Sequence, residues 1–492
     1  MAHRYTLLRV LAPSLLAIVA VAAPVPTHGQ NAIAFVGGTI IDGRGGPPIA
    51  AGTLVVAGGE ILAVGPAGTV AVPAGARVID ATGRYLMPGM VDTNVHTSIY
   101  GTGATLDAYR DRLDLVVQEA AQLHLKHGVT TIRDSYGTLG PLLQVRDAIA
   151  RGDVVGPRMM VAGNIVGWGG PCSVSYSLIR ESDCDLGAQQ FNDMITRGSD
   201  EDLMMLTAGE LRVAFNEYLD LDPDHIRYGG SSHFTPAFIG FSPDAQRVIV
   251  AESHRRGRAV ETHSTTPEAL RVSILAGIDI VQHPESMDRD MPDALVSLIV
   301  ERGVICALRT SPITGQPWRA FEASRQAAAA AQTGAAGRPP TRAELRLAAL
   351  RTDPPIAVRR RNAQKLIRAG CNIAVGSDNY LGAAPEFRTS PKPPLQDPGV
   401  GTLHAIEGLV ELGMTPSQAI VAATRNGALA ARASDRFGTL EPGRLADVLV
   451  LAADPLADIS NLRTIVMVMK EGVIVDHDAL PTQPLWYGRG PR

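Results

Sequence analysis

Hydrophobic and polar positions alternate in short blocks at both ends of the chain. Between residues 32 and 79, runs such as IAFVGGTIIDG and GTLVVAGGEILAVG alternate apolar and polar positions and are broken by glycine. The stretch 447–476 has the same character. A period of two interrupted by glycine predicts short strands joined by tight turns. We therefore expect a small β-sandwich built from the N-terminal and C-terminal segments together.

A different pattern fills the middle of the chain. Apolar strand-like runs alternate with helix-length amphipathic segments, as in GVTTIRDSYG followed by LGPLLQVRDAIARG, and EALRVSILAG followed by IDIVQHPE. Repeated β-then-α units predict an α/β fold in which parallel strands form a barrel covered by helices. We expect the barrel at 89–432, the first part of the β-sandwich at 31–88, and its second part with a C-terminal tail at 433–492.

The first 30 residues follow neither pattern. A basic start is followed by an apolar stretch from Val10 to Ala23 and then by small and turn-forming residues. This order predicts a signal peptide at 1–30 and a periplasmic or secreted protein. A membrane anchor is the alternative, but the apolar run is short and contains Pro13. Farther along, the chain has no apolar run near the ~20 residues that span a bilayer.

Charge narrows the range of partners. The formal net charge is −4 at pH 7, and acidic and basic residues are mixed along the chain. Such a balance gives no electrostatic case for nucleic acid or for an anionic membrane. We expect a small-molecule substrate, no membrane association after signal removal, and we leave a homo-oligomer open.

The predicted export allows the four cysteines to form disulfides. Cys172 and Cys184 lie in the polar stretch GGPCSVSYSLIRESDCDLG, and a disulfide between them would hold this long loop. Cys306 and Cys371 lie in apolar, strand-like runs. We expect these two to be buried free thiols that act as small hydrophobic residues.

Several polar residues stand where a strand is predicted to end. Asn94 and His96 close the first barrel strand, and His263, His283 and Asp378 each follow a later apolar run. The carboxyl ends of parallel barrel strands meet at one face, so these side chains are expected to share a site. Imidazole and carboxylate ligands suit Zn²⁺ or a similar divalent ion, beside which Asp378 would take a proton from water.

These motifs resemble a known family. The ordered series GGTIIDG, YLMPGMVDTNVH, GVTTIRDS, ETHS, VQHPE, GSD and FGTLEPGRLADVLVL is similar to the amidohydrolase superfamily, and closest to its imidazolonepropionase-like and prolidase-like secreted members. The resemblance implies a (β/α)8 TIM-like barrel with a two-part β-sandwich. It also implies attack of metal-activated water on an amide-like carbonyl. By position, it assigns His96, His263, His283 and Asp378 to metal binding and makes Asp378 the general base.

Two positions depart from the family pattern. Asn94 stands where the family has the first histidine of His-x-His, and a neutral amide is a poor zinc ligand beside imidazole. Arg227 stands where two-metal members carry a bridging lysine, and a guanidinium stays protonated and repels a cation. The sequence therefore predicts one zinc ion per chain instead of two, with Arg227 as a second catalytic residue.

Three functions remain open at this point. The first is a metal-dependent hydrolase that cleaves an amide-type C–N bond in a small, possibly peptide-like molecule, with Asp378 as base. In the second, metal binding is weak or lost and Arg227 polarises a carbonyl or grips a carboxylate, as in a lyase or isomerase. The third is a catalytically silent binding protein on the same barrel.

Residues near the predicted strand ends are candidates for contacting the substrate. Each has a structural alternative, such as loop anchoring or packing. The candidates are Asn94, Trp168, Tyr228, His233 and Tyr380.

Overall fold

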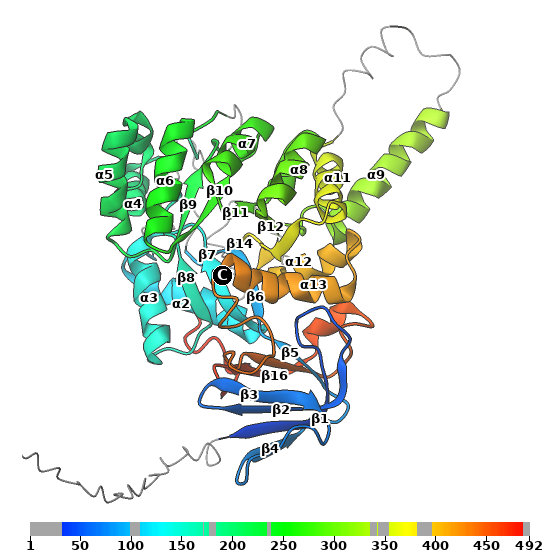
Figure 1. Ribbon diagram of the computed structural model, residues 1–492. Coiled ribbons are helices and arrows are strands. Elements are labelled where there is room, and N and C mark those ends of the chain that lie inside the picture. Colours follow the sequence, from blue (N-terminus) through cyan, green and yellow to red (C-terminus); the bar gives the residue numbers. More distant parts are fainter. Residues whose placement is uncertain are drawn as a thin grey trace, which may run out of the picture.

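The fold consists of a β-rich domain and a larger α/β part that lies against it (Figure 1). The structure is a computed structural model, and the predicted signal peptide at 1–30 lies outside the residues it describes. It describes residues 32–98, 109–170, 172–176, 184–233, 238–334, 342, 354–380 and 396–485, without the side chains of 328–334.

The β-rich domain combines both ends of the chain in one hydrogen-bonded sheet. The strand order is β17-β16-β15-β5-β1-β2-β3, and β4 pairs with β1. The two ends meet where β5 runs antiparallel to β15 and Leu86 pairs with Val450. Alternate side chains such as Phe35, Leu54 and Met469 form its buried core. The strands are β1 Ile33–Ile40, β2 Ile49–Ala57, β3 Glu60–Pro66, β4 Arg77–Asp80, β5 Tyr85–Pro88, β15 Val448–Leu451, β16 Ile465–Lys470 and β17 Val473–Val475.

Parallel strands form the centre of the α/β part, as the β-then-α pattern predicts. They belong to two sheets, with the orders β14-β6-β7-β8 and β13-β12-β11-β10-β9. Backbone bonds connect the β8 region with the β9 region, from Asp224 N–H to Val161 O (2.8 Å), from Val166 N–H to Arg227 O (2.9 Å) and from Gly229 N–H to Val166 O (3.0 Å). The arrangement is TIM-barrel-like, but these sheets do not form one closed ladder. The strands are β6 Met90–His96, β7 Val129–Asp134, β8 Arg158–Val161, β9 His225–Gly229, β10 Ala259–His263, β11 Ile280–Gln282, β12 Ile305–Leu308, β13 Asn372–Val375 and β14 Asn379–Tyr380.

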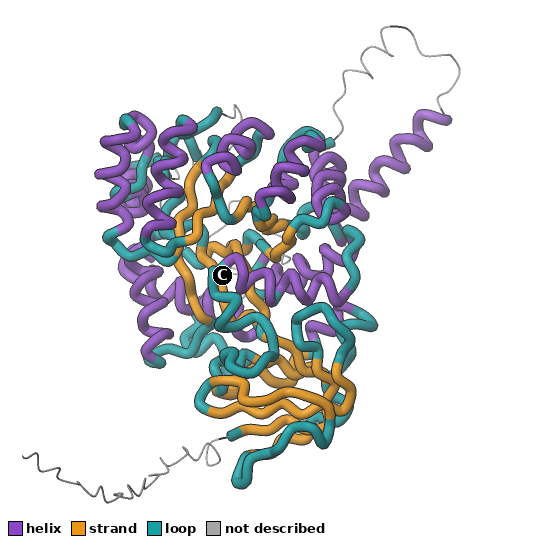
Figure 2. Tube along the Cα trace, viewed as in Figure 1, coloured by secondary structure: helices purple, strands orange, loops and turns teal. Residues whose placement is uncertain are grey.

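Helices cover the outer face of these strands (Figures 1 and 2). Several begin at a capping hydroxyl followed by proline, as at Ser242 and Thr266, because the hydroxyl accepts a free N–H and proline needs none. The helices that follow strands are α2 Leu113–Lys126, α3 Leu139–Arg151, α6 Pro243–Arg255, α7 Pro267–Ala276, α8 Asp293–Arg302 and α12 Val400–Glu411. The others are α4 Leu186–Thr196, α5 Ala208–Leu219, α9 Gly315–Gly334, α11 Pro355–Arg368, α13 Pro416–Ala423 and α14 Arg425–Ala430.

The cysteines behave as predicted. Cys172 and Cys184 form a disulfide, with their Cα atoms 6.0 Å apart. Cys306 and Cys371 are free and buried. Among the described helices, we find none that combines the length and the apolar character needed to cross a membrane.

Candidate active site

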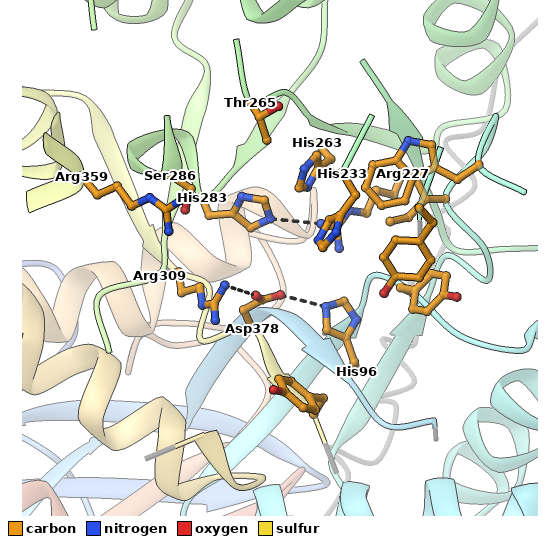
Figure 3. Close-up of a pocket in the computed structure, with 15 residues that line it drawn as sticks. His96, Arg227, His233, His263, Thr265, His283, Ser286, Arg309, Arg359 and Asp378 are labelled. Atoms are coloured by element: carbon orange, nitrogen blue, oxygen red, sulfur yellow. Dashed lines mark hydrogen bonds and ion pairs between the residues drawn. The ribbon is translucent and has the colours of Figure 1, made fainter. Parts of the chain in front are cut away.

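A cavity of about 390 Å³ opens at the carboxyl ends of the α/β strands and brings most of the predicted site residues together. Figure 3 shows side chains from several strand ends pointing into it. The predicted residues that line it are His96, Trp168, Arg227, His233, His263, His283, Asp378 and Tyr380.

Asp378 lies between a histidine and an arginine. Its Oδ1 is 2.9 Å from His96 Nε2, and its Oδ2 is 2.9 Å from Arg309 Nη1 (Figure 3). Burial alone would raise the pKa of this carboxyl, but Arg309 and His96 hold its pKa well below the ordinary value. Asp378 is therefore ionised at neutral pH and can accept a proton.

Asn94 links the two charged residues of the site instead of facing the cavity. Its side chain is fully buried. Its Nδ2 donates to Asp378 Oδ1 over 3.3 Å, and its Oδ1 accepts from Arg227 Nη1 over 3.2 Å. The amide thus donates to a carboxylate and accepts from a guanidinium at the same time, which suits a site that contains Arg227. The prediction that Asn94 contacts substrate is not supported, because Asn94 is absent from the cavity lining.

Arg227 is buried next to the histidine pair. Its Nη1 also donates to Ser135 O (3.3 Å), and its Nη2 lies 3.3 Å from His283 Nε2. Burial lowers the pKa of His283 to about 3, and Arg227 lowers it further against the opposing effect of Asp378. Burial, reinforced by His283, also puts the pKa of His263 well below its usual value. Both imidazoles are thus neutral, which is the form that binds metal ions or accepts a hydrogen bond.

His263 and His283 offer two of the nitrogen donors that a divalent ion would need. Both ring nitrogens of His263 are buried and have no hydrogen-bond partner among the described residues. The centroids of the His263 and His283 rings lie 4.6 Å apart. As they stand, the described side chains include no group of three His, Cys, Asp or Glu residues that could hold an ion. An ion held by His263, His283 and Asp378 would therefore replace contacts that His283 and Asp378 now make with Arg227 and Arg309. The Arg227 guanidinium would repel a cation placed beside it.

The backbone is unusual at two of these residues. His283 and Asp378 have φ angles of +36° and +57°, in the left-handed region that non-glycine residues rarely adopt. Asp92 holds the backbone next to Asp378. Its Oδ1 accepts Ser377 N–H (3.1 Å), and its Oδ2 accepts the Thr402 hydroxyl (2.6 Å). Such strain concentrates at functional sites, and here it directs both side chains into the cavity.

Aromatic rings line the cavity beside His263. The Trp168 and Tyr176 rings are stacked with centroids 5.1 Å apart, and Trp168 contacts the His263 ring edge-on at 4.8 Å. Trp168 Nε1–H donates to Ser231 O over 3.0 Å. A Cβ at Gly229 would collide with the Trp168 indole, so glycine at the end of β9 makes room for this ring.

The placement of Tyr228 differs from the prediction. Its side chain is fully buried outside the cavity, where its hydroxyl donates to Gln246 Oε1 (2.8 Å) and its ring packs against Phe241. Successive side chains on a strand point to opposite sides, so Arg227 faces inward and Tyr228 faces the helices. Tyr228 therefore has no contact with the site.

Several further residues that line the cavity were not predicted from the sequence. Arg309 directly follows the last residue of β12. The histidines were selected because they stand at the end of a strand, and the same criterion would have selected Arg309. Others lie on loops or on a helix, where no periodic signal marks them. They include Tyr136, Tyr176 and Arg359.

Comparison with known proteins decides the family. The model of the Amidohydrolase family matches residues 85–475. The chain belongs to the amidohydrolase family. Its α/β strands and its separate β-rich domain are those of this family, whose members generally depend on divalent metals.

Two solved amidohydrolase structures cover nearly the whole chain. Phenylurea hydrolase B is 31% identical, with a TM-score of 0.82 over 93% of this chain and 100% of that one. Molinate hydrolase is 29% identical, with a TM-score of 0.80 over 94% and 99%. Among curated relatives, ochratoxinase from Aspergillus niger is 29% identical over 226 residues, which are 46% of this chain and 38% of the relative.

These relatives confirm the predicted enzyme class, a hydrolase of carbon–nitrogen bonds. The chain nevertheless spans only 18% to 38% of the length of the curated relatives it matches.

Proposed function

We propose that this amidohydrolase cleaves an amide-type C–N bond in a small molecule, a class that includes peptide-like amides, with Asp378 as the general base. One observation carries the proposal: Asp378 is the one carboxylate among the described residues that line the cavity, and its low pKa keeps it ionised. It lies beside His96, His263 and His283, as a base that serves a shared reaction centre must. The relatives that act on molinate, phenylurea and ochratoxin support this class of bond.

Asp378 and Arg227 have different roles in the proposed reaction. Asp378 takes a proton from the attacking water and passes it to the leaving nitrogen, so amide and water become acid and amine. Arg227 is a fixed positive charge in a buried site, where it stabilises negative charge that develops on the carbonyl oxygen. We propose a single zinc or similar ion held by His263, His283 and Asp378, with His96 holding Asp378 in place. When bound, it supplies Lewis-acid polarisation of the carbonyl.

We further propose the family's closed (β/α)8 barrel at 89–432 and export directed by residues 1–30. The disulfide between Cys172 and Cys184 supports export, because disulfides persist in oxidising compartments. Mass spectrometry of protein secreted by the native host tests this, and an N-terminus at residue 1 would contradict it.

Replacing Asp378 tests the reaction. In Asp378→Asn, the amide cannot accept the proton, and we expect kcat for a hydrolysed amide to fall about 10²- to 10⁴-fold. Undiminished turnover would remove Asp378 from the mechanism. Ligand binding without turnover in the unaltered protein would favour a binding protein, and a product formed without uptake of ¹⁸O from water would favour a lyase or isomerase.

Metal analysis tests the metal count. Protein purified without added metal should carry about one equivalent per chain, because Arg227 and Asn94 replace the residues that hold a second ion. Two equivalents would contradict the assignment. The double variant Asn94→His/Arg227→Lys should gain a second ion if the two positions set the count.

A further inference from the structure

Positive charge dominates the lining of the cavity. Arg309 and Arg359 line it in addition to Arg227, whereas Asp378 is the one carboxylate among the described lining residues. The lining imidazoles do not offset this excess, because an imidazole is either neutral or positively charged. A cavity with more guanidinium than carboxylate groups attracts an anionic ligand.

Arg309 has donor capacity that the protein does not use. Its Nη1 pairs with Asp378 Oδ2 over 2.9 Å. Its Nε is buried and has no partner among the described residues, although its side chain keeps 27% of its surface exposed toward the cavity. A guanidinium has five N–H donors, and two parallel ones match the two oxygens of a carboxylate.

Arg359 approaches the cavity from helix α11, on the same side as Arg309 and Ser286 (Figure 3). Its Nη2 and Nε contact Asp288 Oδ1 at 2.6 and 3.1 Å. The Asp288 side chain is 61% exposed, so water screens this ion pair and the pair contributes little stability. A carboxylate in the cavity can therefore compete for Arg359.

The aromatic rings of Trp168 and Tyr176 lie away from Arg309 and Arg359. Trp168 contacts both His263 and His233, which Figure 3 places across the cavity from Arg309 and Arg359. The Trp168 and Tyr176 rings stack on each other, are largely buried and present only their cavity-facing parts to a ligand. The cavity thus has an aromatic side, where Arg227 also lies, and a second side formed by Arg309 and Arg359.

We propose that the substrate carries a carboxylate bound by Arg309 and Arg359 and an aromatic or flat apolar group bound against Trp168 and Tyr176, with the scissile amide between them. This inference rests on the proposed amide hydrolysis at the same site. N-aroyl amino acids are the simplest compounds of this class. A substrate carboxylate also competes with Asp378 for the Arg309 guanidinium, which frees Asp378 Oδ2 to accept a proton.

Binding of non-hydrolysable ligands tests the carboxylate site apart from the reaction. The matched pair is 3-phenylpropionate and 3-phenylpropan-1-ol, which share a ring and differ in the charged group. We expect calorimetry to show the acid binding at least tenfold tighter than the alcohol, since hydrogen bonds to a charged group are stronger than those to a neutral one. Arg309→Gln should remove about a tenfold preference and Arg359→Gln a smaller one, with alcohol binding unchanged.

Arg361→Gln is the control, because Arg361 lies on the same helix but pairs with the exposed Asp290 at 3.0 Å and does not line the cavity. The preference for the acid should survive in this variant. Equal binding of acid and alcohol in the unaltered protein would overturn the proposal, as would a preference that persists in Arg309→Gln. The second outcome would mean that another group, such as a metal ion, binds the carboxylate.

Hydrolysis separates the two proposals. N-benzoylphenylalanine should be cleaved with a kcat/KM at least tenfold above that of N-benzoylphenylalaninol, and Arg309→Gln should lower this ratio. If neither compound is cleaved but the acid preference persists in binding, the amidase reaction fails and the carboxylate site stands. If both are cleaved at equal kcat/KM and bind equally, the reaction stands and the carboxylate site fails.

Discussion

Two buried arginines on the α/β strands have opposite surroundings. Arg133, on β7, is fully buried and its Nη2 lies 2.9 Å from Glu261 Oε2. Glu261 also accepts from Gln282 Nε2 at 2.9 Å. Arg227, on β9, is equally buried, but its hydrogen-bond acceptors are the neutral groups Asn94 Oδ1, Ser135 O and His283 Nε2.

The charge of Arg133 is neutralised within the protein, whereas the charge of Arg227 can interact with a ligand. Burying a cation is costly unless a counter-charge is close, and Glu261 supplies that charge to Arg133 inside the protein. Arg227 has no such carboxylate at hydrogen-bonding distance among the described residues, and its charge faces the cavity. A ligand or a reaction intermediate with negative charge can therefore complete the environment of Arg227, whereas that of Arg133 is already complete.

The largest effect is expected from breaking the internal pair. Arg133→Leu leaves the Glu261 carboxylate buried without its cation, which destabilises a protein by about 3–5 kcal/mol. Urea denaturation should show this loss in the free energy of unfolding.

The double variant Arg133→Leu/Glu261→Leu is the matched control. It removes both charges and should recover most of the lost stability, because apolar replacements of a whole buried pair are often neutral. A double variant as unstable as the single one would show that Arg133 stabilises the fold through contacts other than Glu261, such as its bond to Ala430 O.

A loss of activity instead of stability is expected at the second arginine. Arg227→Met removes a charge that lines the cavity and that we propose stabilises the carbonyl oxygen, and by comparison with single donors in oxyanion sites kcat should fall about 10²- to 10³-fold. The melting temperature should change much less than in Arg133→Leu. A large fall in stability with near-normal kcat in the folded fraction would contradict the distinction between the two arginines.

Much of the site can be predicted from the order of strands along the chain. Parallel strands bring their carboxyl ends to one edge, so the sequence alone groups His96, Arg227, His263, His283 and Asp378. The same reasoning covers Arg309, which follows β12 directly.

Other features depend on the assembled sheets. The contact between Asn94 and Arg227 joins residues 133 positions apart, and no local pattern specifies it. The direction of Tyr228 was open to prediction, because an inward Arg227 requires an outward neighbour. Asp378 could be predicted as a base, but its ion pair with Arg309 could not, since both side chains reach the contact from separate strands.

A smaller effect is expected from His225, a residue of β9 on which the charges of both arginines act. Its ring is fully buried, neither ring nitrogen has a hydrogen-bond partner among the described residues, and Nε2 lies 3.8 Å from Glu261 Oε2. Burial puts the pKa of His225 well below 6.5, and the charges of Arg133 and Arg227 lower it further. The folded protein therefore keeps His225 neutral, whereas the unfolded chain protonates it near pH 6.5.

This difference sets the sign of a pH effect. Below pH 6.5 the unfolded state binds one proton more than the folded state, so stability falls as the pH is lowered, until the depressed folded-state pKa is reached. One proton corresponds to about 1.4 kcal/mol per pH unit. His225→Gln should reduce the slope of unfolding free energy against pH by about this amount between pH 6 and 5, and leave it unchanged between pH 7 and 8. An unchanged slope at the lower pH would mean that His225 is protonated in the folded protein, and the two arginines would then not exert the combined field that their positions imply.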